Sequence, residues 1–264
     1  MLASTEMELT FAACQKRQYH EISREGLRAR GETVRPAGRF RYAGALWRPE
    51  AYPGHAVVTM VNAHSDNRAL RDALTNAQQE LHSGFKRPDA LYFLPPSSFH
   101  QTIANTLSAE NHHELVVARG LLREFPRMAG DALESAPVPP ADTIVTMRMI
   151  GMGIFGAALG ILGVFDRESE FDRIAALRDH FYGNDRIIGL GIRRTRPFIG
   201  HITLAYIESH LESADRQSLV SAVESISRAF LDREIRFFLP FCELRAYEHL
   251  AEFKHLPGIA TARL

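Results

Sequence analysis

The chain has 264 residues, a formal net charge of zero and a pI near 7.2. Its hydrophobic content of 45% and charged content of 23% are typical of a globular protein with a sizeable core. The balanced charge argues against a broadly basic nucleic-acid binder, so any RNA contact would be local, such as a terminus held in a cleft. The two cysteines, Cys14 and Cys242, form neither a disulfide framework nor a metal-site spacing.

The first segment, residues 1–39, is predicted to be a helical extension that packs on the rest of the chain. Residues 5–31 favour a helix, and Gly31 and Pro36 end it. Residues 1–8 are acidic and lack the basic start and apolar run of a signal peptide. With so few cysteines as well, we expect a cytoplasmic protein.

The next part of the chain, up to residue 155, alternates predicted strands and helices. A β-rich run covers residues 55–61, and Ser65 or Asp66 is a candidate cap for a helix over residues 67–82. The elements that follow are a short extended segment, a strand, a helix, a proline-rich loop and a strand, over residues 91–94, 99–104, 110–125, 132–142 and 143–150.

The same order recurs in the last part of the chain. Its predicted elements are a strand, a helix, an extended segment, a strand, a helix and a strand, over residues 159–165, 168–182, 187–193, 198–204, 214–231 and 234–244. This repetition predicts an α+β fold with two pseudo-symmetric lobes, roughly residues 40–155 and 156–264, between which strands can be exchanged. The most apolar segment, residues 147–165, contains five glycines and one arginine, which favours β pairing over a membrane helix.

Two copies of one short motif lie at matching places in this repeat. His100-Gln101-Thr102 and His201-Ile202-Thr203 stand 101 residues apart, each in a β-favouring stretch. Side chains two residues apart on a strand point to the same face, so each strand presents a histidine with a threonine. Motifs this short also arise by chance, and ordinary structural histidines are the alternative, so the interpretation depends on the repeat around them.

The residues around both motifs resemble the two-histidine phosphoesterase superfamily, which includes cyclic nucleotide phosphodiesterases and bacterial RNA ligase-like proteins. The likeness covers roughly residues 38–247, and it is closest to a branch catalogued as a domain of unknown function. It is carried by the strings 94–102, 196–206, Phe40-Arg41-Tyr42 and Pro53-Gly54-His55. It implies two antiparallel sheets around a central groove, with helices outside, and metal-independent cleavage without a cofactor. Gly200 departs from the pattern, which loosens the strand or admits a close approach by ligand.

The motif residues suit the hydrolysis of a cyclic phosphodiester. One histidine acts as the base that activates water and the other as the acid that protonates the leaving oxygen, which predicts a bell-shaped pH dependence. Thr102 and Thr203 donate hydrogen bonds to the non-bridging oxygens. The predicted catalytic residues are therefore His100, Thr102, His201 and Thr203, with the acid and base roles left open.

Strand parity and charge suggest further site residues. Parity places Ser98 and Ala104 on the face of His100, and Ile199 and Ala205 on the face of His201. It turns Phe99, Phe198 and Tyr206 to the opposite face, so these three are left out of the site. Arg148, in an apolar run, is either a phosphate clamp or an exposed alternation position. The predicted substrate-binding residues are Ser98, Arg148, Arg41 and Arg196.

Other residue patterns in the sequence favour structural roles. His112-His113 are expected on a solvated helix face rather than in a metal site, because adjacent helical residues point apart. The glycines of residues 151–163 lack the spacing of a dinucleotide-binding loop. We therefore expect a monomeric phosphodiesterase that acts on a nucleotide or an RNA terminus, without metal or membrane. The alternatives are a non-catalytic nucleotide or RNA-end binding module, or a structural protein with a vestigial groove.

Overall fold

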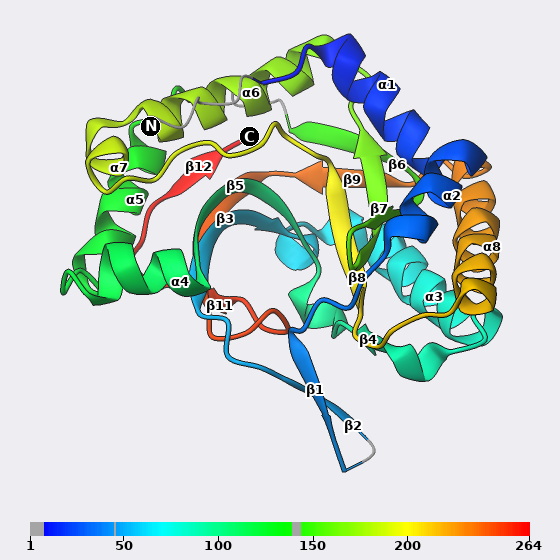
Figure 1. The fold of residues 1–264 in the computed structure, drawn as a ribbon. Coiled ribbons are helices and arrows are strands. Elements are labelled where there is room, and N and C mark those ends of the chain that lie inside the picture. The colour runs from blue at the N-terminus through cyan, green and yellow to red at the C-terminus, as the bar shows by residue number, and fades with distance from the viewer. Residues whose placement is uncertain (1–7, 45, 139–143) are drawn as a thin grey trace.

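The computed structural model describes residues 8–44, 46–138 and 144–264. Two antiparallel sheets lie around the centre of the molecule, and the helices lie along its periphery (Figure 1). The predicted α+β fold is confirmed. None of the helices in the described ranges is both long enough and apolar enough to span a membrane.

Each sheet has five strands and carries one of the two motifs. The first sheet has the order β11-β10-β3-β5, with β12 paired to β10. These strands are Lys254–His255, Phe241–Tyr247, Gly54–Met60, His100–Ser108 and Thr261–Arg263. The second sheet has the order β4-β8-β7-β6-β9. Its strands are Leu91–Phe93, His201–Ile207, Ala158–Val164, Val145–Phe155 and Arg236–Leu239. Thus β4 and β6 join the sheet of the second motif, and β10 joins the sheet of the first.

The N-terminal region forms two helices where the sequence predicts one. They are α1 (Phe11–Ile22) and α2 (Arg24–Thr33), and residues 5–7 of the predicted helix lie outside the described ranges. Ser23 separates them in an extended conformation, and its hydroxyl accepts from the Gly26 N–H as the N-cap of α2. The prediction of one helix is wrong because this cap competes with helix continuation.

The region after β5 also differs from the prediction of one helix over residues 110–125. The chain forms α4 (Ala109–His112), a π-helical turn (His113–Val117) and then α5 (Glu124–Glu134). Gly120 interrupts them with a φ of 71°. Pro126 lies in the first turn of α5, where its missing N–H costs nothing. Because α5 extends into the loop predicted over 132–142, that prediction fails at its start; residues 139–142 lie outside the described ranges.

Two further predicted segments differ in the second half. Residues 187–193 are not all extended, because Asn184 caps a short helix, α7 (Asp185–Gly189), with its side chain. The single strand predicted over 234–244 is two, β9 and β10, which belong to different sheets. Pro240 separates them, since proline has no N–H to donate to a strand ladder.

The remaining helices lie where the sequence predicts them. They are α3 (Arg68–Gly84), α6 (Glu168–Gly183) and α8 (Ser213–Leu231). A hairpin of β1 (Phe40–Ala43) and β2 (Leu46–Pro49) projects away from both sheets (Figure 1). The main core runs between the sheets and the helices that cover them.

Two buried glutamines fix helices to the second sheet near its motif. Gln18 of α1 donates to the carbonyl oxygens of Gly163 (2.9 Å) and Gly200 (2.7 Å). Gln78 of α3 donates to those of Leu94 and Leu204, each at 2.8 Å. Each bond contributes about 0.5–1.5 kcal/mol, and leaving one of these carbonyls unpaired would cost more. The strand that carries His201 is therefore held from two sides.

Candidate active site

The two motifs meet at one cavity between the sheets. His100 is the first residue of β5 and His201 the first residue of β8. Both histidines, with Thr102 and Thr203, line a cavity of about 330 Å³. The structure thus brings together the four residues that the sequence predicts to be catalytic.

Each histidine is oriented by the backbone two residues before it. His100 Nδ1 lies 2.7 Å from the Ser98 carbonyl oxygen, and His201 Nδ1 lies 3.0 Å from that of Ile199. A carbonyl oxygen only accepts, so Nδ1 carries the proton in both rings. In the neutral rings Nε2 is then an acceptor, free to bind water or ligand.

The surroundings of both rings favour the neutral form. The pKa of His100 and of His201 is lowered to about 4, chiefly by burial, and the nearby positive charge of Arg196 contributes to the lowering for His201. Phe253 packs on His100 with ring centroids 4.0 Å apart, and Phe155 packs on His201 at 5.3 Å. In the unliganded protein both imidazoles are therefore neutral at pH 7.

Both motif strands contain a β-bulge at the same place, and this overturns the parity prediction for the residues after each motif, whereas Phe99 and Phe198 are buried as predicted. In β5 the pairing moves from Thr102 to Ala104, and in β8 from Thr203 to Ala205, so Ile103 and Leu204 are the extra residues. Ala104 and Ala205 consequently turn into the core. The residues that line the cavity after the motifs are instead Asn105 and Tyr206, which also stand 101 residues apart.

Gln101, which sequence reasoning missed, joins the two motif strands. Its side chain is fully buried. Its Oε1 accepts from the His201 N–H at 2.6 Å, and its Nε2 donates to the carbonyl oxygens of Thr102 (2.7 Å) and Ile199 (3.1 Å). Gln101 thereby fixes the start of β8 against β5. Its only signal in the sequence is a polar residue at an inward strand position, which does not reveal its partner 100 residues away.

Arg196 is the predicted substrate-binding residue that the structure places at the cavity. Its Nη2 donates to Asn105 Oδ1 at 2.9 Å. Buried Arg178 donates to the Arg196 carbonyl oxygen at 2.8 Å and binds Glu8 at 2.7 Å, which holds this loop in place. Loss of hydration lowers the pKa of Arg196, and the charge of Arg178 lowers it further. Such a guanidinium gains from a bound anion.

The other three predicted substrate-binding residues lie elsewhere. Ser98 is buried and its hydroxyl donates to the Pro95 carbonyl oxygen at 2.8 Å, so it contributes to the site only through its own carbonyl. Arg148 pairs with Asp166 at 3.0 Å on the outer side of its strand, and Arg41 pairs with Glu50 at 2.9 Å in the β1–β2 hairpin. The positive charge of each of these arginines suggested a phosphate clamp, but in the structure a carboxylate of the protein neutralises it.

Gly200 and His112 also depart from their predicted roles. The close approach at Gly200 is made by the protein and not by a ligand, since a Cβ there would lie 2.7 Å from the Gly163 carbonyl oxygen. His112, at the end of α4, is buried, and its ring packs on His55 of β3 with centroids 5.2 Å apart. Among the described residues, no group of three or more His, Cys, Asp or Glu could hold a metal ion.

One wall of the cavity is aromatic and was absent from the predicted site. Tyr52, Tyr206 and Tyr247 line it, and the Arg39 guanidinium lies 3.9 Å from the centre of the Tyr52 ring. Burial raises the pKa of Tyr206 to about 12, so its hydroxyl stays protonated and can donate a hydrogen bond. The cavity thus offers hydrogen-bond donors, positive charge and flat apolar faces.

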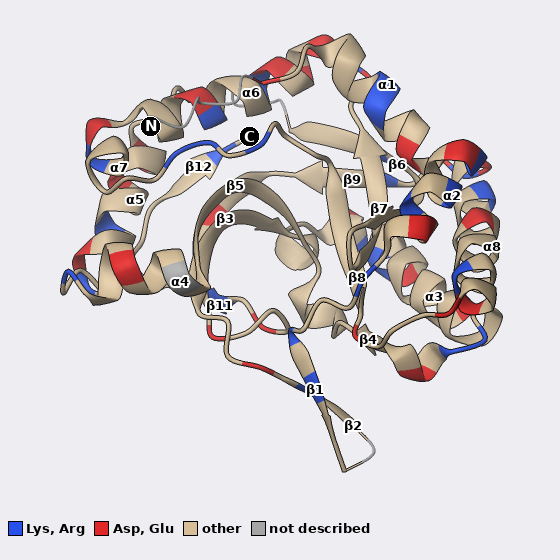
Figure 2. Cartoon of the chain, viewed as in Figure 1, with Lys and Arg blue, Asp and Glu red and all other residues tan. Residues whose placement is uncertain are grey.

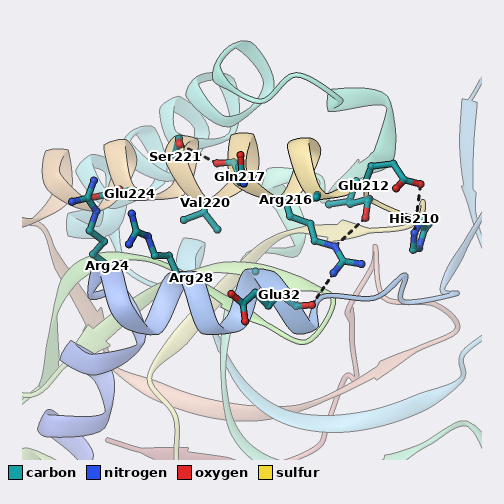
Figure 3. Close-up of a pocket in the computed structure, with 13 residues that line it drawn as sticks. Arg24, Arg28, Glu32, His210, Glu212, Arg216, Gln217, Val220, Ser221 and Glu224 are labelled. Carbon is teal, nitrogen blue, oxygen red and sulfur yellow. Dashed lines mark hydrogen bonds and ion pairs between the residues drawn. The ribbon is translucent and has the colours of Figure 1, made fainter.

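A larger cavity, of about 730 Å³, lies between α2 and α8 (Figure 3). Two of its arginines are engaged within the protein, since Arg216 donates to the carbonyl oxygens of Leu211 and Glu32 and Arg24 pairs with Glu224. It contains neither motif histidine. Chemistry rather than size therefore identifies the smaller cavity as the candidate active site.

Comparisons with known proteins identify similar structures and no similar sequence. No protein-family model matches the chain, and no curated protein matches it. A conserved protein of unknown function from Agrobacterium tumefaciens has a TM-score of 0.60 and 18% identity, over 90% of this chain and 96% of that one. This likeness shows a shared fold.

Two further solved structures match less closely. A Thermus thermophilus protein has a TM-score of 0.42 and 15% identity, over 72% of this chain and 86% of its own. Kluyveromyces marxianus Usb1, solved with uridine monophosphate, has a TM-score of 0.41 and 12% identity, over 80% and 97%. The structural neighbours of the chain thus include Usb1 and conserved proteins whose function is unknown.

Proposed function

We propose that the protein is a phosphodiesterase that hydrolyses a cyclic phosphodiester, either a 2′,3′-cyclic nucleotide or the cyclic phosphate at an RNA terminus. The observation that carries the proposal is the matched pair of imidazoles at one cavity, each with Nδ1 bonded to its own backbone. Because Nδ1 of each ring is bonded to a carbonyl oxygen, Nε2 of each ring is the nitrogen that transfers a proton. Two such rings at one cavity supply both a base and an acid.

The reaction follows from these two nitrogens. Nε2 of the neutral histidine takes a proton from water while the water oxygen forms a bond to phosphorus. The bond from phosphorus to the ribose 2′ or 3′ oxygen breaks, and Nε2–H of the protonated histidine gives its proton to that oxygen. Thr102, Thr203 and Arg196 donate to the non-bridging oxygens, where negative charge builds up. Either histidine fits either role.

The substrate itself supplies the charge that the acid needs. In the free protein the pKa of both imidazoles is about 4. A bound phosphodiester carries a negative charge, which favours the protonated form of an adjacent imidazole and raises its pKa. Binding therefore converts a neutral pair into an acid and a base. The proposed chemistry needs no metal and no cofactor.

The aromatic wall fits the rest of a nucleotide. Tyr52 and Tyr206 offer ring faces on which a base stacks, and such stacking contributes about 1–3 kcal/mol per base. Stacking accepts any base, so this wall favours nucleotides over other phosphodiesters without selecting a sequence.

Replacement of each motif histidine tests the proposal. His100→Ala and His201→Ala should each lower kcat for a 2′,3′-cyclic nucleotide about 10²–10⁴-fold, in buffer that contains a chelator, while circular dichroism stays unchanged. The control is His113→Ala, because His113 is exposed on the π-helical turn away from the cavity. Full turnover in either motif variant would refute the proposal. Saturable binding of the nucleotide without product would instead identify a binding module.

A further inference from the structure

A second cavity adjoins the candidate active site. It has a volume of about 320 Å³. The two cavities share five lining residues, Tyr52, Asn105, Ser108, Arg196 and Tyr247. Shared walls make them two parts of one groove, so a single ligand of sufficient length can occupy both.

The lining of this second cavity is polar and carries positive charge. Beyond the shared residues it includes His55, Thr106, Asn111, Arg193 and Thr195. None of the described residues that line it is an Asp or a Glu. Arginine, asparagine and threonine side chains all donate hydrogen bonds, and donors without a nearby carboxylate favour an anion.

One loop carries three arginines, of which one stabilises the loop and two line the groove. The loop between α7 and β8 carries a run of basic residues (Figure 2). Arg194 is bound to Glu8 and Asp179, so its charge is satisfied within the protein. Arg193 is exposed at the second cavity, and within the described ranges no carboxylate pairs with it. The loop therefore anchors itself through Arg194 and leaves Arg193 and Arg196 for the groove.

The boundary between the cavities is rigid. Tyr182 donates its hydroxyl to the Asn105 carbonyl oxygen at 2.8 Å, and Asn105 Oδ1 accepts from Arg196. Tyr52 donates to the Ser108 hydroxyl at 3.2 Å on the opposite side. At the inner end, His55 is only 7% exposed and its Nδ1 has no hydrogen-bond partner among the described residues. Walls held by such hydrogen bonds, with one unpartnered polar atom at the inner end, are characteristic of a preformed site.

We propose that this second cavity binds a second phosphate group of the same substrate, with Arg193 as its main ligand and with Arg196, which lines both cavities, between the two phosphates. The inference rests on the proposed function, because it places the reacting phosphate at His100 and His201. The second phosphate can be the phosphodiester of a neighbouring nucleotide or a 5′-monophosphate on the reacting nucleotide. Both present the same oxygens to a guanidinium.

Binding of three matched ligands tests this inference. The ligands are uridine 2′,3′-cyclic phosphate, the same nucleotide with a 5′-phosphate, and a uridine dinucleotide that ends in a 2′,3′-cyclic phosphate. Calorimetric titration uses the full chain with His201→Asn, so that binding is measured without turnover. At least one ligand with a second phosphate should bind on the order of tenfold more tightly than the first, as expected for a charge-assisted contact. Whichever ligand shows the gain identifies the source of the phosphate.

The Arg193→Gln variant should abolish that gain, so that the affinity ratio falls to about one. Arg119→Gln is the matched control, because Arg119 is an exposed arginine that lines neither cavity. Equal binding of all three ligands, or an unchanged ratio in Arg193→Gln, would overturn the inference even if the enzyme turns over cyclic nucleotides. A preserved ratio without any turnover by the unmodified chain would overturn the proposed function and leave the second phosphate site standing.

Discussion

At the scale of single residues, the site is built from side chains whose orientation is set by the backbone. The carbonyls of Ser98 and Ile199 fix the two imidazoles, and Gln101 fixes the start of β8 against β5. The sequence predicts the histidines and threonines because a motif repeated at equal spacing is visible in one chain. It does not predict Gln101, because its partners His201 and Ile199 lie about 100 residues away along the chain, and it does not predict the cavity role of Arg39.

The low pKa values of the two histidines predict separate pH profiles for the free and the bound enzyme. The ratio kcat/KM reports the free enzyme, in which both pKa values are about 4. The singly protonated pair becomes scarcer as pH rises, so kcat/KM should fall about tenfold per pH unit above about pH 5. Because the bound phosphate raises the pKa of the acid, kcat should begin to fall only at a higher pH than kcat/KM does. Steady-state rates over a pH series measure both, and coincident profiles would contradict this account.

Gln101 predicts a loss of both stability and turnover. Gln101→Met keeps the volume but leaves the His201 N–H and the Ile199 carbonyl without this partner, which should lower the free energy of unfolding by about 1–3 kcal/mol. Because His201 is then less well positioned, kcat should fall more than KM changes. Urea denaturation and steady-state kinetics measure the two effects. Gln79→Met, at an exposed position of α3, should change neither; an equal effect there would dismiss the positioning role.

At the scale of secondary structure, the predictions failed where one local feature competed with a periodic pattern. Ser23 divides a predicted helix, Pro240 divides a predicted strand, and Gly120 with the π-helical turn reshapes a predicted helix. The bulges at Ile103 and Leu204 have the largest consequence, since they change which residues face the groove. A bulge depends on pairing with a neighbouring strand, so the alternation of one strand does not reveal it.

The contact between β3 and α4 predicts a specific loss of stability in acid. The pKa of His55 is lowered to about 4, chiefly by burial and in smaller part by His112 next to it; Glu248 raises the pKa of His112. The unfolded chain, with a histidine pKa near 6.5, takes up this proton first as pH falls. The contribution of His55 is therefore fully present above about pH 6.5 and is lost toward pH 4, a change of about 3 kcal/mol.

Replacement of His55 checks this effect. His55→Phe retains a ring against Phe125 and should make the free energy of unfolding less dependent on pH between 7 and 4, by about the same 3 kcal/mol. Urea denaturation at several pH values measures it, with His113→Gln as the control. If the free energy of unfolding of His55→Phe depended on pH as strongly as that of the unmodified chain, protonation of His55 would not be coupled to unfolding.

At the scale of the whole molecule, equivalent residues of the two motif strands are separated by a constant 101 positions. The two sheets that contain these strands each combine strands from both halves of the chain. Residues 98, 100, 102 and 105 correspond to 199, 201, 203 and 206, down to the carbonyl that orients each histidine. Gln101 breaks this symmetry, because Ile202 occupies the matching position. The repeated order of elements predicts the two lobes, whereas the membership of each sheet depends on long-range pairing that the order does not specify.

The exchange of strands between the sheets has a consequence for biosynthesis. In the sheet that carries His100, Val58 of β3 pairs with Glu243 of β10, near the end of the chain. Contacts of such wide separation slow folding, because the intervening chain must be ordered before they form. During translation, the strand that carries His100 can complete its sheet only after β10 has left the ribosome. The sheet that carries His100 is thus incomplete until β10 has been synthesised, and a chain truncated before β10 cannot complete it.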